Sequence, residues 1–231
     1  MNQMLSIVVP TRNEAANVST LVQRVSEALG SSQWELIFVD DSDDGTPDAV
    51  AALAHPRVRL RHRPAPDRRG GLAGAVCDGF AAARGELLVV MDGDLQHDPA
   101  MLPALRGSLD EVDIAIASRY AAGECAAGLD GPHRVLVSRV SRAVARALFP
   151  RVRRVRDPLA GFFAFRRILL DGARLQPVGF KILLELLVRG SWRSVRELPY
   201  RMAERQAGSS NASLREGLRF GTHLLRLRFT T

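Results

Sequence analysis

The stretch LLVVMDGDLQHDP, residues 87–99, is the most informative part of this chain, because an apolar run ends there at two carboxylates spaced one residue apart. In an extended backbone, residues i and i+2 project to the same side, so Asp92 and Asp94 point together beyond the strand end. Two such carboxylates repel each other, and a bound cation relieves the repulsion. Mg²⁺ and Mn²⁺ favour oxygen ligands and are often shared with substrate phosphates, so the stretch indicates a phosphate-handling metal site. The alternative is an acidic surface turn.

Two further apolar runs end in polar residues in the same way. The run WELIFVDDSDDGT at 34–46 leads into an acidic cluster that begins with Asp40 and Asp41. The run LSIVVP at 5–10 leads into TRNE at 11–14. Open α/β sheets bind their ligands at the carboxyl ends of the strands. We therefore expect three strand ends to converge on one edge of a sheet.

The first half of the chain alternates strand and helix signals, which predicts an α/β fold with a mostly parallel sheet and helices on both faces. The predicted strands lie at 5–10, 34–40, 57–62, 86–91 and 112–117, and the predicted helices at 15–29, 46–54, 71–84 and 99–108. After the third strand, the run DRRGGLAG at 67–74 forms a basic, glycine-rich turn that opens a helix. Backbone N–H groups at a helix start can hold phosphate, so Gly71 is a candidate contact, and a plain turn is the alternative.

Length and composition fit a globular enzyme. A chain of 231 residues with 46% hydrophobic content is long enough for one large α/β core, and no composition break divides it, so we expect a single domain over residues 1–231. No run approaches the roughly 18 to 20 apolar residues that cross a bilayer, and the N-terminus lacks a secretion signal. We therefore expect a soluble or peripheral protein inside the cell. The cysteines, Cys77 and Cys125, fit neither a disulfide framework nor a metal cluster.

The net charge of +7 indicates an acidic partner. Such a partner is either a nucleic acid, a phosphorylated substrate or an anionic membrane surface. Helix-turn-helix, zinc-finger and aromatic RNA-binding motifs are missing from the sequence, and only 6% of the residues are aromatic, which leaves few platforms for stacking bases. We therefore expect no nucleic-acid partner. A genome rich in G and C explains part of the arginine excess without any function.

Two stretches carry opposed basic and apolar faces. Within 134–149, one side of a helical wheel carries Arg139, Arg142 and Arg146, and the other carries Leu136, Val140, Val144 and Leu148. A similar pattern at about 212–229 predicts a C-terminal amphipathic helix. Such helices either lie on an anionic bilayer or pack their apolar face on the protein core, and the pattern alone leaves both open.

These motifs and several later ones occur in the order seen in a known family. They are VVPTRNE, VDDSDDGT, GGLAGA, MDGDLQHDP, SRY at 118–120, DPLAGFFAFRR at 157–167, GFKILLELL at 179–187 and Arg205-x-x-Gly208. The chain resembles the inverting glycosyltransferases of the GT-A fold and, more narrowly, the dolichyl-phosphate and polyprenyl-phosphate mannose synthases. The resemblance runs from Ser6 to about Leu227.

This resemblance implies a reaction and its participants. A mannosyl group would pass from GDP-mannose to the phosphate of a dolichyl or polyprenyl lipid, with inversion at the sugar carbon and with Mg²⁺ or Mn²⁺ as cofactor. Because the acceptor is a lipid, the protein would be peripheral on the cytoplasmic face of a membrane, docked on the membrane surface or on a membrane-embedded subunit.

The resemblance also implies roles for individual residues. Those that would contact the nucleotide are Pro10, Arg12, Asn13, Glu14 and Gly71, with Asp40 and Asp41 near the base and ribose. The residues that look like the metal-binding set are Asp92, Asp94 and Gln96. Arg119 and Arg134 fall where relatives place arginines near the acceptor phosphate, and Arg205 falls where one meets the donor diphosphate. Asp94 and these three arginines are the candidate catalytic residues, and each arginine has a solvated surface charge as its alternative.

Two positions depart from the family pattern. Relatives carry Gly-x-Ser-Lys where this chain reads GSSN at 208–211, and an aromatic residue is common at the place of Arg12. The alternatives are therefore a UDP-sugar donor such as UDP-glucose, or a non-catalytic nucleotide-sugar-binding homologue. Of the remaining carboxylates, Asp157 precedes a proline and would cap a turn, and Glu185 would serve acceptor positioning or structure. The small residues of the loop at 123–131 predict that it moves over the substrates.

Overall fold

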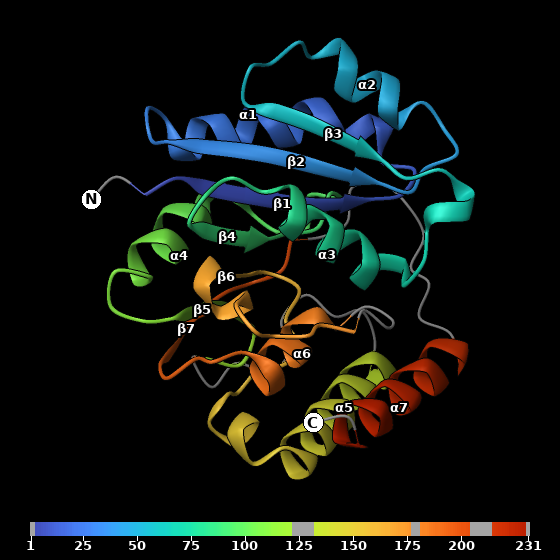
Figure 1. The fold of residues 1–231 in the computed structure, drawn as a ribbon, viewed down its shortest axis with the longest axis vertical. Coiled ribbons are helices and arrows are strands. Elements are labelled where there is room, and N and C mark those ends of the chain that lie inside the picture. The colour runs from blue at the N-terminus through green and yellow to red at the C-terminus, as the bar shows by residue number, and fades with distance from the viewer. Residues whose placement is uncertain (1–2, 122–131, 177–180, 204–213, 230–231) are drawn as a thin grey trace.

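The computed structural model describes residues 3–121, 132–176, 181–203 and 214–229, which form an α/β fold with helices on both sides of a central sheet (Figure 1). Seven strands of this part of the chain lie in the order β3-β2-β1-β4-β6-β5-β7. The strands are β1 (Leu5–Thr11), β2 (Trp34–Asp40), β3 (Val58–His62), β4 (Leu87–Val90), β5 (Ile114–Ser118), β6 (Phe163–Arg166) and β7 (Val195–Pro199). Only β6 runs antiparallel to its neighbours among these, so the predicted mostly parallel sheet is confirmed.

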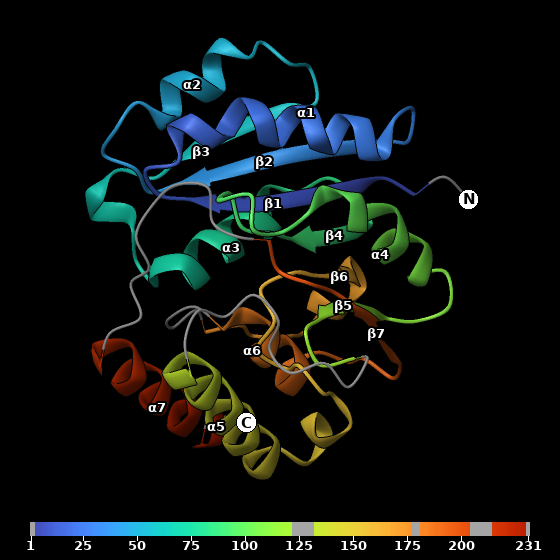
Figure 2. The ribbon, with the colours of Figure 1, turned by 180° about the vertical axis from the view of Figure 1, so that it is seen from behind.

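The helices divide between the two faces of the sheet (Figures 1 and 2). One apolar core holds residues of α1 (Val18–Leu29), α2 (Thr46–Ala52) and α4 (Leu102–Ser108). The other core holds residues of α3 (Gly71–Ala82), α5 (Pro132–Leu148), α6 (Ile182–Arg189) and α7 (Leu214–Phe229). Short 3-10 helices at Ala15–Asn17, Ala65–Asp67, Pro99–Met101, Pro150–Arg154 and Arg167–Leu170 complete the described helical structure.

The central strands serve both cores because strand side chains alternate between the faces of a sheet. In β1, Leu5, Ile7 and Val9 join the core under α1, whereas Val8 joins the core under α3. Every residue of β1 is buried. A parallel strand that is covered on both faces reads as a nearly continuous apolar run, which is why these segments were recognisable in the sequence.

The predicted elements are found with small shifts at their ends. The helix predicted at 15–29 is a 3-10 turn followed by α1, and the helix predicted at 99–108 is a 3-10 turn followed by α4. Asp98 begins the second of these turns, because its carboxylate accepts a hydrogen bond from the Ala100 N–H at 3.0 Å. The amphipathic helix predicted at about 212–229 is α7. Strands β6 and β7 have no counterpart among the predicted elements.

The insertion of β6 between β4 and β5 shapes the edge where ligands would bind. The parallel strands β1, β2, β4 and β5 end at this edge. Because β6 runs the other way, the residues just before it, Gly161 and Phe162, reach the same edge. They lie beside Asp92, which follows β4, and Arg119, which follows β5. Three loops that are distant in sequence therefore meet there.

Helix α5 turns its apolar side away from the core. Its large apolar residues are 37 to 60% exposed, and they are Leu136, Val137, Val140, Val144 and Leu148. The side that faces the protein carries Ala145, which is fully buried, together with Ser138 and Arg142. Ser138 Oγ lies 2.9 Å from Tyr120 Oη, and the Arg142 guanidinium lies 3.8 Å from the centre of the Tyr120 ring. The sequence left open whether the apolar face of α5 packs on the protein core or lies on a bilayer. The exposure of these side chains shows that this face does not pack on the described core.

Helix α7 lies beside α5 in both views (Figures 1 and 2). Leu224 and Leu227 are buried in the core, whereas Leu225 is 60% and Phe229 is 83% exposed. Among the described residues, the structure contains no helix with both the length and the apolar character needed to span a bilayer. The two neighbouring helices thus both carry exposed apolar side chains.

Candidate functional site

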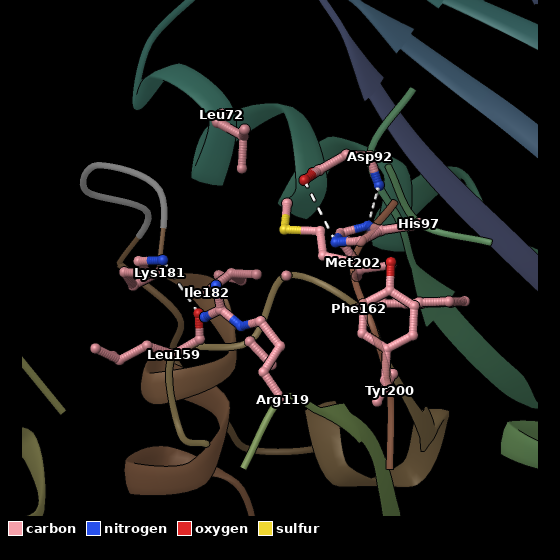
Figure 3. Close-up of a pocket in the computed structure, with 14 residues that line it drawn as sticks. Leu72, Asp92, His97, Arg119, Leu159, Phe162, Lys181, Ile182, Tyr200 and Met202 are labelled. Carbon is pink, nitrogen blue, oxygen red and sulfur yellow. Dashed lines mark hydrogen bonds and ion pairs between the residues drawn. The ribbon is translucent and has the colours of Figure 1, made fainter. Parts of the chain in front are cut away.

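A pocket of about 150 Å³ opens at the edge where β4, β5 and β7 end (Figure 3). Its polar lining residues are Asp92, His97, Arg119, Lys181 and Tyr200. Apolar side chains, among them Leu72, Leu159 and Met202, line the rest. The pocket has two unlike ends: Asp92 and His97 lie on one side, and Arg119 and Lys181 lie on the other.

Asp92 is held by a histidine that the sequence-based prediction did not single out. The Asp92 N–H donates to His97 Nδ1 at 2.9 Å, so Nδ1 is the acceptor and the proton of the neutral ring lies on Nε2. His97 Nε2 lies 3.7 Å from Asp92 Oδ2 (Figure 3). The ring is buried and stacks on Phe162, with 5.0 Å between the ring centres. His97 therefore holds the backbone of Asp92 and lies beside its carboxylate, and the Asp92 side chain stays 35% exposed.

The loop from Asp92 to His97 bends away from the strand. Strand β4 ends at Val90, and Leu95 has a φ of +63°, so the two predicted carboxylates lie on a turn and not on an extended backbone. Asp94 is 5% exposed, and its Oδ1 accepts the Gln96 N–H at 3.1 Å. The turn brings Asp92 to the pocket lining, whereas Asp94, two residues on, is buried and is not among the lining residues.

Gln96 fastens this loop to the segment after β7. The Ala203 N–H donates to Gln96 O at 3.0 Å, and Gln96 Nε2 donates to Ala203 O at 3.1 Å. The Tyr200 hydroxyl also donates to Gln96 O, and burial raises the pKa of Tyr200 above its ordinary value. Since the Gln96 amide nitrogen is engaged, its amide oxygen is the atom that a cation would take.

The residues of this loop fit a divalent cation that is shared with a substrate. In the described ranges, no three His, Cys, Asp or Glu side chains are grouped as a metal site by themselves. Asp92, Asp94 and Gln96 offer two carboxylates and one amide oxygen, which are hard oxygen donors. Mg²⁺ and Mn²⁺ sites with few protein ligands are completed by water and phosphate oxygens. The set therefore suits a cation that arrives with a diphosphate.

The cationic end of the pocket is built on Asp157. The Arg119 N–H and Nε both donate to Asp157 Oδ2, at 3.3 and 3.4 Å. Asp157 is 1% exposed, and its own N–H donates to Glu197 Oε1 at 2.8 Å. Its carboxylate thus orients the Arg119 guanidinium, which is a more specific role than the turn cap expected from the sequence. Lys181 Nζ donates to Leu159 O at 3.1 Å on the same side of the pocket.

The loops after β1 and β2 are tied to each other. The Asn13 N–H donates to Ser42 Oγ at 2.7 Å, and Asn13 Oδ1 accepts the Asp43 N–H at 3.2 Å. The Glu14 N–H donates to Thr46 Oγ1 at 3.0 Å. Asn13 has a φ of +60°, a conformation that asparagine tolerates better than most residues. The convergence of these strand ends was predicted correctly.

The candidate nucleotide contacts differ in exposure. Pro10 is buried within β1, and Arg12 and Asn13 are exposed. Asp40 is fully buried and accepts hydrogen bonds from the hydroxyls of Thr11 at 2.8 Å and Ser42 at 2.5 Å. The Asp40 side chain therefore serves the fold, and contact with a ribose or base stays a prediction.

Asp41 is bound by a buried arginine that the sequence-based prediction also missed. Arg63 donates to both Asp41 oxygens, from Nε at 2.7 Å and from Nη2 at 2.6 Å. Arg63 also donates to Asp78 Oδ2 at 3.2 Å and to the carbonyls of Arg69 and Gly71 at 3.4 and 3.0 Å. The bond to Asp41 raises the pKa of Arg63. Arg63 thus connects the end of β2, the glycine-rich turn and helix α3.

The glycine-rich turn leaves no room for a side chain at Gly74. Gly71 has a φ of +57° at the start of α3. A Cβ on Gly74 would lie 2.0 Å from the Arg69 carbonyl oxygen. Leu72, between these glycines, lines the pocket. The predicted helix start is confirmed, and phosphate contact by Gly71 stays a prediction.

Several candidates lie outside what the structure describes. Arg205, the GSSN run at 208–211 and the loop at 123–131 belong to the undescribed ranges. Arg134 lies in the first turn of α5, but its side chain is not among those described. Their predicted roles near the acceptor phosphate and the donor diphosphate stay predictions.

Glu185 is buried in α6 away from the pocket lining. Its Oε1 accepts the Gln176 N–H and lies 3.3 Å from Arg189 Nε. Burial raises the pKa of the Glu185 carboxyl, and the contacts with Gln176 and Arg189 act in the opposite direction. Burial likewise raises the pKa of the Cys77 thiol to about 12, which makes it a poor nucleophile.

Fold and site together define a glycosyltransferase of the GT-A fold. Residues 6–171 match the family model described as "Glycosyl transferase family 2", and the chain belongs to that family. Solved structures agree on the fold. Glucosyl-3-phosphoglycerate synthase from Mycobacterium tuberculosis, solved with Mn²⁺, UDP-glucose and phosphoglyceric acid, superposes with a TM-score of 0.74 at 21% identity, covering 99% of this chain and 79% of that one.

Curated relatives confirm the resemblance to the polyprenyl-phosphate mannose synthases. The chain is 36% identical to a dolichol-phosphate mannosyltransferase of Pyrococcus furiosus, over 96% of this chain and 63% of that protein. It is 35% identical to a dolichol-phosphate mannosyltransferase of Saccharomyces cerevisiae, over 90% of this chain and 80% of that protein. A polyprenol monophosphomannose synthase of Mycolicibacterium smegmatis is 32% identical, over 91% of this chain and 82% of that protein. The chain thus spans less than two thirds of the archaeal relative.

Proposed function

We propose that this chain transfers a mannosyl group from GDP-mannose to the phosphate of a dolichyl or polyprenyl lipid with the help of Mg²⁺ or Mn²⁺. The observation that carries the proposal is the two-ended pocket. The Asp92 loop at one end suits a cation with a diphosphate, and Arg119 at the other end suits a second anion. The names of the relatives, dolichol-phosphate mannosyltransferase and polyprenol monophosphomannose synthase, support a mannosyl group and a polyprenyl phosphate as acceptor. GDP as the carrier of the mannosyl group is part of the proposal.

The proposed reaction is a displacement at the sugar carbon, in which the acceptor phosphate takes the place of the donor diphosphate. An oxygen of the acceptor phosphate would form the new bond to the sugar carbon, and the bond from that carbon to the diphosphate oxygen would break, with its electron pair leaving on GDP. A bound divalent cation stabilises the charge that develops on the leaving diphosphate. Arg119, held by Asp157, would orient the acceptor. An ionised phosphate attacks without a strong base, so the pocket has no need of a further catalytic carboxylate.

The donor is tested by measuring transfer to a short polyprenyl phosphate in detergent from labelled GDP-mannose and, separately, from UDP-glucose. We expect kcat/KM for GDP-mannose to exceed that for UDP-glucose by at least about 100-fold, because a site that hydrogen-bonds one base leaves polar groups unpaired with the other. A higher kcat/KM for UDP-glucose would show that the donor is UDP-glucose and not GDP-mannose. Nucleotide binding without any product would favour the non-catalytic alternative.

We further propose that the exposed side of α5 and α7 docks on an anionic membrane, on the cytoplasmic face. The apolar row of α5 and the exposed Leu225 and Phe229 of α7 would enter the lipid interface. Arginines beside them, such as Arg139 and Arg228, would meet lipid phosphates. The net charge of +7 is complementary to such a surface. Docking there would bring the pocket to a lipid acceptor.

Replacing Leu136 and Val140 together by glutamate is expected to weaken binding to vesicles of phosphatidylcholine and phosphatidylglycerol at least about tenfold. The reason is the loss of apolar burial, worth roughly 1.5–3 kcal/mol for each side chain when complete. Cosedimentation measures the partition. The matched control is Leu60→Glu on β3, at the opposite edge of the sheet, which should bind like the wild type. Equal binding by both variants would contradict membrane docking and point to a membrane-embedded protein partner.

A further inference from the structure

We propose that Glu197, on strand β7, is a positioning residue for the end of the pocket that holds the acceptor phosphate. Its carboxylate binds the backbone of Asp157, and Asp157 in turn binds Arg119. The proposal rests on the function proposed above and assigns a role to a residue outside the motifs quoted for the family. Glu197 is not among the lining residues of the pocket, so its effect on the acceptor would pass through Asp157 and Arg119.

The Glu197 carboxylate binds two successive backbone N–H groups. Its Oε2 accepts the Arg156 N–H at 2.7 Å, and its Oε1 accepts the Asp157 N–H at 2.8 Å. Hydrogen bonds that involve an ionised group are shorter and roughly twice as strong as those between neutral groups. Both carboxylate oxygens are therefore engaged in fixing the backbone at Asp157.

Strand β7 gives this carboxylate a rigid base. It pairs in parallel with β5, and Glu197 lies opposite Ile116 in the register. Strand β5 ends at Ser118, and Arg119 follows directly at the end of the pocket opposite Asp92 (Figure 3). Two neighbouring strands thus carry Arg119 and the carboxylate that holds the partner of Arg119. Groups held by strands are positioned more precisely than groups on loops.

Asp157 passes this position on to Arg119. Its side chain is 1% exposed, and its Oδ2 accepts the Arg119 N–H at 3.3 Å and the Arg119 Nε–H at 3.4 Å. The direction of the guanidinium therefore depends on where the Asp157 backbone lies. A misplacement of about 1 Å can lower the efficiency of an oriented group roughly 100-fold. Loss of the Glu197 carboxylate would release the Asp157 backbone and so misplace Arg119.

A carboxylate with the same bonding pattern lies at the other end of β7. Asp113 Oδ2 accepts the N–H groups of Arg193 and Ser194 at 2.7 and 3.0 Å, just before β7 begins. Asp113 directly precedes β5, at the edge of the sheet opposite the pocket. Replacing Asp113 removes backbone hydrogen bonds of the same kind far from the acceptor, so Asp113 provides the matched control.

The test compares Glu197→Ala and Glu197→Gln with Asp113→Ala and Asp113→Asn. Geranyl phosphate is titrated in the absence of donor, and thermal unfolding verifies that each variant is folded. We expect Glu197→Ala to raise the Kd for geranyl phosphate at least about tenfold, because a misplaced Arg119 loses hydrogen bonds to a charged group. Glu197→Gln keeps one acceptor oxygen and should raise this Kd at least about threefold. The Asp113 variants should bind geranyl phosphate like the wild type, and the Kd for Mn²⁺ with GDP should change less than about twofold in every variant.

A double-mutant cycle separates positioning from a general loss of stability. In an Arg119→Met background, Glu197→Ala should raise the Kd for geranyl phosphate less than about twofold, because its effect passes through Arg119. Equal factors with and without Arg119 would overturn the proposal. The same holds for a Glu197→Gln variant that binds geranyl phosphate as Asp113→Asn does, a comparison that decides the matter even where Glu197→Ala does not fold.

Failure of the proposed function gives a different result. Absence of turnover with any donor, by a wild type that binds geranyl phosphate, contradicts the proposed reaction and leaves the result for Glu197 standing, because the titration needs no donor. A wild type that does not bind geranyl phosphate would overturn both proposals.

Discussion

Replacing Asp94 by asparagine is expected to lower kcat for mannosyl transfer at least about 1,000-fold, or ~4 kcal/mol in the activation free energy. Asp94 keeps the shape of its loop through the bond from the Gln96 N–H, and an asparagine can keep that bond. What asparagine loses is the negative charge that would hold a divalent cation against the leaving diphosphate. The change therefore removes charge and leaves the fold intact.

Two measurements separate this role from a structural one. The binding of Mn²⁺ in the presence of GDP, followed by electron paramagnetic resonance, should weaken at least about tenfold in Asp94→Asn. The control is Asp98→Asn in the same stretch, an exposed carboxylate that caps the 3-10 turn at Pro99–Met101. Asparagine caps equally well, so this variant should keep wild-type activity and Mn²⁺ binding. Asp94→Asn with near-normal activity would contradict the metal site.

Replacing Arg63 by methionine is expected to cost about 3–5 kcal/mol of the free energy of unfolding. Arg63 is 3% exposed and bonds both oxygens of Asp41 together with Asp78. Without it, the buried carboxylate of Asp41 would lose its two hydrogen bonds and the charge of the arginine that they come from, and the carbonyls of Arg69 and Gly71 would lose a donor. Urea unfolding measures the change.

An exposed ion pair provides the comparison for Arg63. Arg196 and Glu111 form a surface pair at 2.6 Å, with side chains 40 and 67% exposed, so Arg196→Met should cost no more than about 1 kcal/mol. Adding Asp41→Asn to Arg63→Met should recover part of the loss, because the unbalanced charge is removed. A cost for Arg63→Met as small as that for Arg196→Met would show that the network around the glycine-rich turn adds little to stability.

The strands and the metal loop could be predicted because local signals carry them. Apolar runs that end in carboxylates marked β2 and β4, and the spacing of apolar residues marked α1. The order of motifs then identified the family, which the match over residues 6–171 confirms. Strand β6 was not predicted. It has only four residues, and it pairs with β4 and β5 in the antiparallel direction, across a long stretch of sequence.

Other site residues were missed because their roles depend on distant contacts. His97 was quoted within the decisive stretch, yet only the fold shows that its ring holds Asp92 and stacks on Phe162. Arg63 reads as an ordinary surface cation among many in a basic chain, and Lys181 lies in the quoted run at 179–187 without a role assigned to it. The sequence does place Arg63 directly after a predicted strand, at the same edge of the sheet as Asp41. This position alone does not distinguish a buried arginine from an exposed one.

The class of fold, the edge that carries the chemistry and the acidic loop after β4 could be read from short segments of sequence, because each of them follows from side-chain periodicity and residue type. Contacts between distant segments determine which side of α5 is buried, which cation holds Asp41 and which residues lie beside Arg119 in the pocket. A helical pattern gives two faces of a helix but not the neighbour that each one meets. That neighbour is set by packing between segments such as Tyr120 and α5, whose contacts no local pattern encodes.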